Sequence, residues 1–231
     1  AMEHGGNPVA ELAAHVAHRM VEHHLRTMHR VGVRYDLLPK ESDILALKFW
    51  GDAFLRLKNA SAIKLIDSGK NAGCWVMPLA DTPEFAGLED PDKVIVRSDG
   101  TVTYVGKDIA YQLWKLGKLD KDFRYRRHRG PDGRELWTTT STEGESGAPV
   151  FGHAAQVFNV IDVGQSYPQR VVKAGVAALG YAAEAERSYH LAYEKVVLSP
   201  RTARALGYDV AQDEAAVKVS GRKGLGVKAD D

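Results

Sequence analysis

The residues from Arg97 to Gln112 restrict the possible folds most, because they contain an abrupt change from strand to helix periodicity. Val94 to Val96 is a β-branched run, and the Asp99-Gly100 dipeptide after it is a strong hairpin signal. Thr101 to Val105 again favours a strand, so we predict that a strand turns back on itself here. Gly106 is predicted to break this pattern before a helix begins. Such a passage from strand to helix indicates an α/β fold, in which ligands bind at strand ends.

Two side chains in this stretch suit a bound cation. Tyr104 and Asp108 are four residues apart, and both are expected to face the mouth of a site. A carboxylate can accept two hydrogen bonds from a guanidinium group. From these two residues alone, however, the favoured interpretation is a strand tyrosine beside a carboxylate in the first turn of a helix, where carboxylates are common.

The composition indicates a globular protein of one large or two small domains, because 44% of the 231 residues are hydrophobic. The net charge is +1, which argues against a broad polyanion-binding surface and against DNA as a partner. No apolar run approaches the roughly 20 residues that span a bilayer, and no signal peptide is apparent. We therefore expect a cytoplasmic protein that does not bind membranes.

Neither cysteine nor histidine indicates a metal site. Cys74 is the single cysteine, which excludes an internal disulfide and a cysteine zinc cluster. Pro8 to Arg30 is predicted to be one amphipathic helix that ends at Gly32, and it carries five histidines. Two histidine pairs have a spacing that could share a metal, but no third ligand is placed with them. We predict no metal site.

Further along the chain, Glu41 to Leu57 is predicted to be helical, Ala72 to Leu79 a strand and Asp81 to Asp92 a loop. Phe158 to Val163 is an apolar run typical of a central parallel strand, and a helix is predicted from Pro168 to Leu179.

Gln165 lies between that strand and that helix, so it is expected at the same sheet edge as Tyr104. A surface or capping glutamine explains this position equally well. A third apolar run extends from Ser188 to Leu198, and a basic, glycine-rich segment begins at Lys218. Taken alone, this last segment is typical of a disordered end.

Two motifs resemble class I arginyl-tRNA synthetases of the bacterial type. Tyr-x-x-x-Asp after Ser-Asp-Gly-Thr resembles their amino-acid-binding segment, and Lys218-Val-Ser-Gly-Arg-Lys-Gly224 is similar to the mobile loop that closes over ATP. Segments from about residue 20 to 231 follow the order of this family. The resemblance implies a partial Rossmann-like α/β core of parallel strands and flanking helices. Residues 7–92 are then a helical connecting insertion with short strands, and residues 93–231 the second half of the catalytic domain.

Residues 120–150 are expected to be an excursion from this domain and its most variable or disordered part. Arg124 to Arg129 is a basic run, and Pro131 to Gly133 forms a predicted turn. Thr138 to Gly147 is polar, with few hydrophobic residues. A solvated hairpin is the favoured interpretation of the basic run, and contact with tRNA phosphate is the alternative.

The resemblance also implies roles for individual residues. It assigns arginine binding to Tyr104, Asp108 and Gln165. It places His190 on the adenosine side, although Tyr193 and Glu194 depart from the family pattern. The residues implied to act on ATP during catalysis are Lys218, Ser220, Gly221, Arg222 and Lys223.

The implied reaction activates L-arginine with ATP, accompanied by Mg²⁺ and without a tightly bound cofactor, and transfers the arginine to tRNA-Arg. The first Rossmann half, with its His-x-Gly-His signature, and the anticodon-binding domain are not recognised in this sequence. His15-Val-Ala-His18 does not replace that signature, because Ala17 stands where the glycine is needed and no strand precedes it. We therefore expect this chain to be inactive alone.

Two other classes of function are considered. A non-catalytic, truncated synthetase paralogue could bind arginine or a partner protein. A nucleotide-binding α/β enzyme of another kind is less well supported, because neither Gly-x-Gly-x-x-Gly nor Gly-x-x-x-x-Gly-Lys-Ser/Thr is present.

Overall fold

The computed structural model describes residues 6–211 and 216–218. Four of the residues implied to act on ATP therefore lie outside the described residues, namely Ser220, Gly221, Arg222 and Lys223. The helices are α1 Pro8–Arg30, α2 Glu41–Ala46, α3 Phe49–Asn59, α4 Tyr104–Lys115, α5 Ser166–Ala178, α6 Ala182–Glu186 and α7 Pro200–Ala205, with short 3₁₀ turns η2 Pro83–Phe85 and η3 Val163–Gln165. The strands are β1 Leu37–Leu38, β2 Lys64–Leu65, β3 Trp75–Met77, β4 Lys93–Val96, β5 Arg124–Arg129, β6 Glu135–Thr140, β7 Val157–Asp162, β8 Ser188–Tyr193, β9 Val197–Leu198 and β10 Val217–Lys218.

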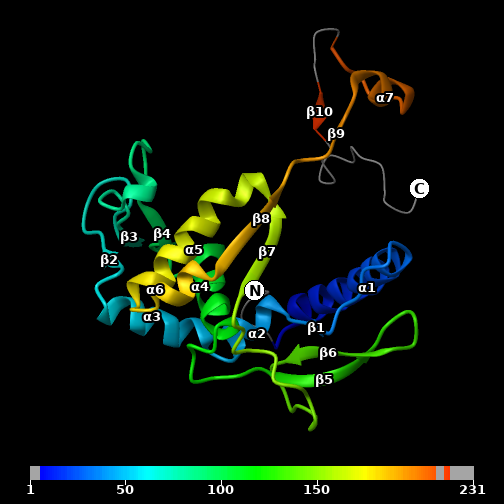
Figure 1. Ribbon diagram of the computed structural model, residues 1–231, viewed down its shortest axis with the longest axis horizontal. Coiled ribbons are helices and arrows are strands. Elements are labelled where there is room, and N and C mark those ends of the chain that lie inside the picture. Colours follow the sequence, from blue (N-terminus) through cyan, green and yellow to red (C-terminus); the bar gives the residue numbers. More distant parts are fainter. Residues whose placement is uncertain (1–5, 212–215, 219–231) are drawn as a thin grey trace.

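The strands form small sheets around a group of helices. β7 and β8 run parallel, whereas β2, β3 and β4 form an antiparallel sheet. Helices α4 and α5 lie between these two sheets, α3 runs below them in this view, and α7 with β9 and β10 stands apart (Figure 1). On the other side, β5 and β6 form a hairpin, and β1 pairs in parallel with β6.

Helix α4 is the centre of the hydrophobic core. It packs against α3, α5 and β4, and Ile109 and Leu113 on it are fully buried. Two glycines permit this close packing. A Cβ atom on Gly175 of α5 would lie 2.8 Å from Ile109 Cδ1, and one on Gly106 would lie 3.1 Å from the Trp50 ring. Gly106 was predicted to end a strand before the helix begins. This prediction was wrong, because Gly106 lies within α4.

The Asp99-Gly100 turn is confirmed, but the strand predicted after it is not. Gly100 has a φ of 84°, and the amide of Arg97 donates to the carbonyl of Thr101. Only an isolated bridge between Val96 and Val102 follows, and α4 begins at Tyr104. The Thr103 hydroxyl lies 3.1 Å from the carbonyl oxygens of Val94 and Ile95, which ties the chain back to β4 and ends the pairing. Tyr104 thus lies in the first turn of a helix.

Two further expectations changed. The predicted helix from Glu41 to Leu57 is divided into α2 and α3 by Lys48, which adopts a left-handed φ of 60°. The strand pairing of β7 is parallel, as predicted, but one of its faces is open. Among the described residues β7 pairs only with β8, and Phe158 and Val160 are 53% and 66% exposed, so the expected central position of this strand was wrong. The helix over Pro8–Arg30 is confirmed.

The segment predicted to be variable or disordered is a hairpin with specific anchors. The Thr139 side chain is fully buried, and its hydroxyl donates to Asp43 Oδ2 at 2.6 Å and accepts from the Lys40 amide at 2.8 Å. On the opposite side, His128 Nε2 lies 3.1 Å from Glu22 Oε1 of α1. The expectation of disorder was therefore wrong, whereas the hairpin interpretation of the basic run is confirmed.

Replacing Thr139 with valine is expected to lower the free energy of unfolding by about 2 kcal/mol, because the buried Asp43 carboxylate loses a hydrogen-bond donor. Urea denaturation measures this change. Thr142→Val is the matched control, since Thr142 is exposed on the loop after β6. Its effect should stay within about 0.5 kcal/mol. Equal losses in the two variants would contradict the anchoring role of Thr139.

Candidate functional site

Tyr104 and Asp108 lie one turn apart on the same face of α4, because residues four apart in a helix are neighbours on its surface. Tyr104 is half exposed and Asp108 is half-buried. Within the described residues, the Asp108 carboxylate has no hydrogen bond or ion pair. A half-buried carboxylate without a partner is a favourable position for a cation that carries its own hydrogen-bond donors.

Partial burial determines the electrostatics of Asp108. Loss of solvent raises the pKa of this carboxyl, and the nearby Glu41 carboxylate raises it further. The ammonium groups of Lys115 and Lys107 act in the opposite direction. Lys107 is itself paired with Glu41, at 2.9 Å, and its effect on the pKa of Asp108 is smaller than that of Glu41. A guanidinium beside Asp108 would relieve the cost of leaving its charge half-buried.

A lysine connects Tyr104 to the beginning of α5. Lys93 Nζ of β4 lies 5.4 Å from the centre of the Tyr104 ring and 5.3 Å from that of Tyr167. The Tyr167 hydroxyl donates to the Pro91 carbonyl at 3.0 Å. These contacts hold the N-terminal ends of α4 and α5 beside β4.

Gln165 precedes Tyr167 by two residues and occupies the last position of η3, immediately before α5. Its side chain is half-buried, and its amide makes no hydrogen bond to any residue that the structure describes. The structure therefore places all three predicted arginine-binding residues at the N-terminal ends of two packed helices. Their binding roles stay predictions, since no contact joins Gln165 to Asp108.

Other polar residues on the same face of α4 were not recognised from the sequence. The Gln112 amide donates to Ser188 Oγ, and Lys115 Nζ donates to Asn159 Oδ1, each at 2.9 Å. Asn159 Nδ2 then donates to Gln169 Oε1, also at 2.9 Å. The sequence signal that could have identified Gln112 and Lys115 is their spacing of four and seven residues from Asp108, which places all three on one helix face.

His190 and Lys218 lie away from these groups. Asn159 and His190 are opposite each other in the β7–β8 pair, and His190 Nε2 lies 3.0 Å from the Ile161 carbonyl oxygen. Lys218 is exposed on β10, in the part that stands apart in Figure 1. Neither the adenosine-side role of His190 nor the ATP role of Lys218 is tested by this arrangement.

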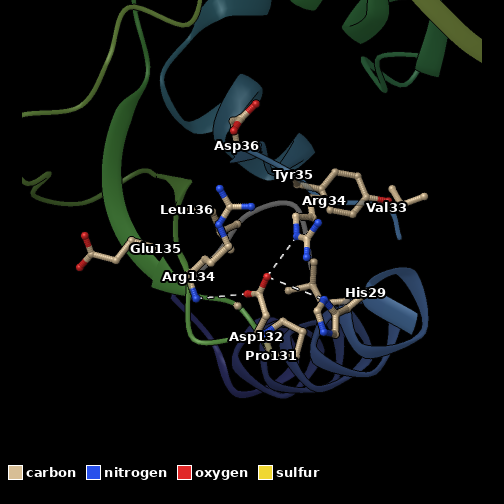
Figure 2. Close-up of a pocket in the computed structure, with 12 residues that line it drawn as sticks. His29, Val33, Arg34, Tyr35, Asp36, Pro131, Asp132, Arg134, Glu135 and Leu136 are labelled. Carbon is tan, nitrogen blue, oxygen red and sulfur yellow. Dashed lines mark hydrogen bonds and ion pairs between the residues drawn. The ribbon is translucent and has the colours of Figure 1, made fainter. Parts of the chain in front are cut away.

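A separate cavity between α1 and the β5–β6 turn is lined by charged groups that already bind one another. Figure 2 shows Asp132 directed toward Arg34 and His29. The Asp132 carboxylate lies 3.3 Å from Arg34 Nε and 3.7 Å from His29 Nδ1, and it accepts from the Arg134 amide. Because the Asp132 carboxylate is satisfied by these internal partners, we interpret this cavity as a structural junction rather than a second candidate site.

The described residues contain no group of three or more histidine, cysteine, aspartate or glutamate side chains that could hold a metal ion. Within the same part of the chain, no helix has the length and apolar character required to cross a membrane.

Comparison with known proteins agrees with these motifs. The chain is 39% identical over 196 residues to an arginine–tRNA ligase of Thermococcus kodakarensis, a match that covers 85% of this chain and 30% of that protein. It is 41% identical over 207 residues to the arginine–tRNA ligase of Thermus thermophilus, covering 90% and 31%. The chain is homologous to part of an arginine–tRNA ligase. The resemblance to arginyl-tRNA synthetases is thereby confirmed.

The solved structure of the Thermus thermophilus arginyl-tRNA synthetase supports the same relationship. It superimposes with a TM-score of 0.70 at 38% sequence identity, over 89% of this chain and 36% of that one. This match confirms a mixed α/β fold that corresponds to part of a synthetase catalytic region. No protein-family model matches the chain. The chain spans about a third of the length of these arginine–tRNA ligases.

Asp108→Asn is expected to be at least as stable as the parent at neutral pH, because it removes a half-buried charge and keeps the shape. Since burial raises the pKa of Asp108, the folded chain binds this proton more tightly than the unfolded chain. The contribution of Asp108 to stability therefore falls as pH rises through the raised pKa, and the variant lacks this dependence. Urea denaturation between mildly acidic and neutral pH measures the difference. A variant that is clearly less stable at neutral pH would show that Asp108 is a structural residue.

Proposed function

We propose that this chain supplies the arginine-binding part of an arginine–tRNA ligase. The observation that carries the proposal is the half-buried Asp108 carboxylate, which has no hydrogen bond or ion pair among the described residues and lies one turn from Tyr104. A guanidinium fits this arrangement because its planar donors can bind a carboxylate through two hydrogen bonds. Tyr104 and the Gln165 amide would complete the binding site.

The proposed reaction begins when the arginine carboxylate attacks the α-phosphate of ATP. Arginyl-adenylate and pyrophosphate form, and the arginyl group then passes to a terminal hydroxyl of tRNA-Arg. This chemistry needs no side-chain nucleophile, so catalysis depends on positioning the reactants and stabilising developing charge. The Asp108 site would contribute to positioning, since it holds the far end of the amino acid.

The charge that develops on pyrophosphate would be met by cations of the Lys218 segment. Lys218, Arg222 and Lys223 are proposed as these cations, Ser220 as a hydrogen-bonding residue, and Gly221 for the flexibility of the loop. Mg²⁺ would accompany ATP as part of the substrate complex. His190 is proposed to lie on the adenosine side.

We further propose that the chain alone does not aminoacylate tRNA. It corresponds to about a third of its relatives' length. In addition, the face of the β7–β8 pair that carries Phe158 and Val160 is exposed, whereas parallel sheets are normally covered on both faces. The alternative is a non-catalytic module that binds arginine or a protein partner. The exposed face of the β7–β8 pair is the one observation that favours it.

The experiment that tests the arginine site is calorimetric titration with a non-hydrolysable arginyl-adenylate analogue, with the lysyl analogue as a control. We expect the chain to bind the arginyl form and not the lysyl form. Asp108→Asn should weaken binding by at least about tenfold, because a charge-assisted hydrogen bond contributes about 1.5–3 kcal/mol.

Asp81→Asn is the matched control for this substitution, because Asp81 is exposed in the loop before η2 and no interaction of its side chain is found among the described residues. It should bind like the parent. Equal binding by Asp108→Asn would contradict the proposed role of Asp108. Failure of the folded parent to bind either analogue would contradict a preformed arginine site and favour the alternative of a protein-binding module.

A further inference from the structure

Lys115 is a partly buried cation on the helix face that carries Asp108, two turns further along α4. Its ammonium lies 4.4 Å from the centre of the Tyr111 ring and donates to Asn159 Oδ1 at 2.9 Å. Burial lowers the pKa of Lys115, and the negative charge of Asp108 opposes this change. Lys115 is therefore coupled to Asp108 through its charge, although the two groups form no ion pair.

The charged groups that face Asp108 come from two helices. Glu41 of α2 is the acidic one, and Lys107 and Lys115 of α4 are the cations. Glu41 and Lys107 form an ion pair with each other, at 2.9 Å. Lys115 is held by the neutral amide of Asn159, and no carboxylate among the described residues forms an ion pair with it. Of the nearby cations, Lys115 most strongly opposes the rise in the pKa of Asp108 that burial causes.

Lys115 also determines the direction of a chain of hydrogen bonds. An ammonium group can only donate, so the Asn159 side chain must turn its oxygen to Lys115 and its nitrogen to α5. There, Asn159 Nδ2 donates to Gln169 Oε1 at 2.9 Å. Gln169 lies one turn after Gln165 on α5. This chain therefore links the helix that carries Asp108 to the helix that follows Gln165.

We propose that Lys115 is a positioning residue for the Asp108 site: it places a positive charge two turns from the carboxylate on the same face of α4 and, through Asn159 and Gln169, fixes α4 relative to α5. As a positioning residue it acts through its neighbours and does not touch the arginine side chain. The inference rests on the proposed function where it concerns arginine, but the control of Asp108 by Lys115 can be measured without any ligand.

The test compares three variants. Lys115→Met keeps the length of the side chain but removes its charge, Lys115→Arg keeps the charge and the donors, and Asn159→Leu removes the link to α5. The Asp108 carboxyl is titrated by NMR in the free chain. In parallel, binding of the arginyl-adenylate analogue is measured from mildly acidic to neutral pH.

Lys115→Met is expected to raise the pKa of Asp108, and to move the acidic loss of analogue binding to higher pH. Its affinity at neutral pH should fall by about tenfold, because the loss of the internal Lys115–Asn159 hydrogen bond loosens the position of α4 relative to α5. Lys115→Arg should restore the parental pH profile. Asn159→Leu should weaken binding without moving the profile, because the ammonium charge remains.

An unchanged Asp108 titration in Lys115→Met would overturn the inference. Weaker binding by this variant with an unshifted pH profile would also overturn it, because a lysine with a purely structural role would give that result. If the parent binds no analogue, the proposed function fails. The NMR titration then decides separately whether Lys115 controls the charge of Asp108. Lys173→Met on α5 is the matched control, because Lys173 pairs with Glu186 and should leave the Asp108 titration unchanged.

Discussion

The close approach of α4 and α5 is the constraint on which the rest of this structure depends. Gly175 permits it, because a Cβ atom at this position would lie 2.8 Å from Ile109 Cδ1. The approach brings the first turn of α4 beside the start of α5, where Lys93 lies over the rings of Tyr104 and Tyr167. A contact between two apolar helix faces thus determines where the polar ends of both helices meet.

Asp108 shows that the candidate arginine site lowers the stability of the folded chain. Its half-buried carboxylate has no hydrogen-bond or ion-pair partner in the described part of the chain, which raises the free energy of the folded state, and the raised pKa of Asp108 reflects that cost. The buried Asp43 accepts a hydrogen bond of 2.6 Å from Thr139. The contrast between these two aspartates distinguishes a structural carboxylate from one suited to an external cation.

Local patterns in the sequence predicted the helix over Pro8–Arg30, the Asp99-Gly100 turn and the parallel strand that begins near Phe158. Features that depend on distant contacts were not predictable in this way. The role of Gly106 depends on Trp50, and the burial of Thr139 depends on Asp43, almost a hundred residues earlier. Tyr104 and Asp108 were found from a motif, whereas Lys115 was missed because its partner Asn159 lies on another element.

The β7–β8 pair shows what these polar contacts contribute to the fold. A parallel strand is ordinarily held by neighbours on both sides and covered on both faces. In the described part of the chain, β7 and β8 pair only with each other, and one face leaves Phe158 and Tyr189 53% and 38% exposed. The covered face is fixed to α4 by Lys115–Asn159 and Gln112–Ser188. The polar face of α4 therefore has two functions: its second turn presents Asp108, and its later turns hold the β7–β8 pair.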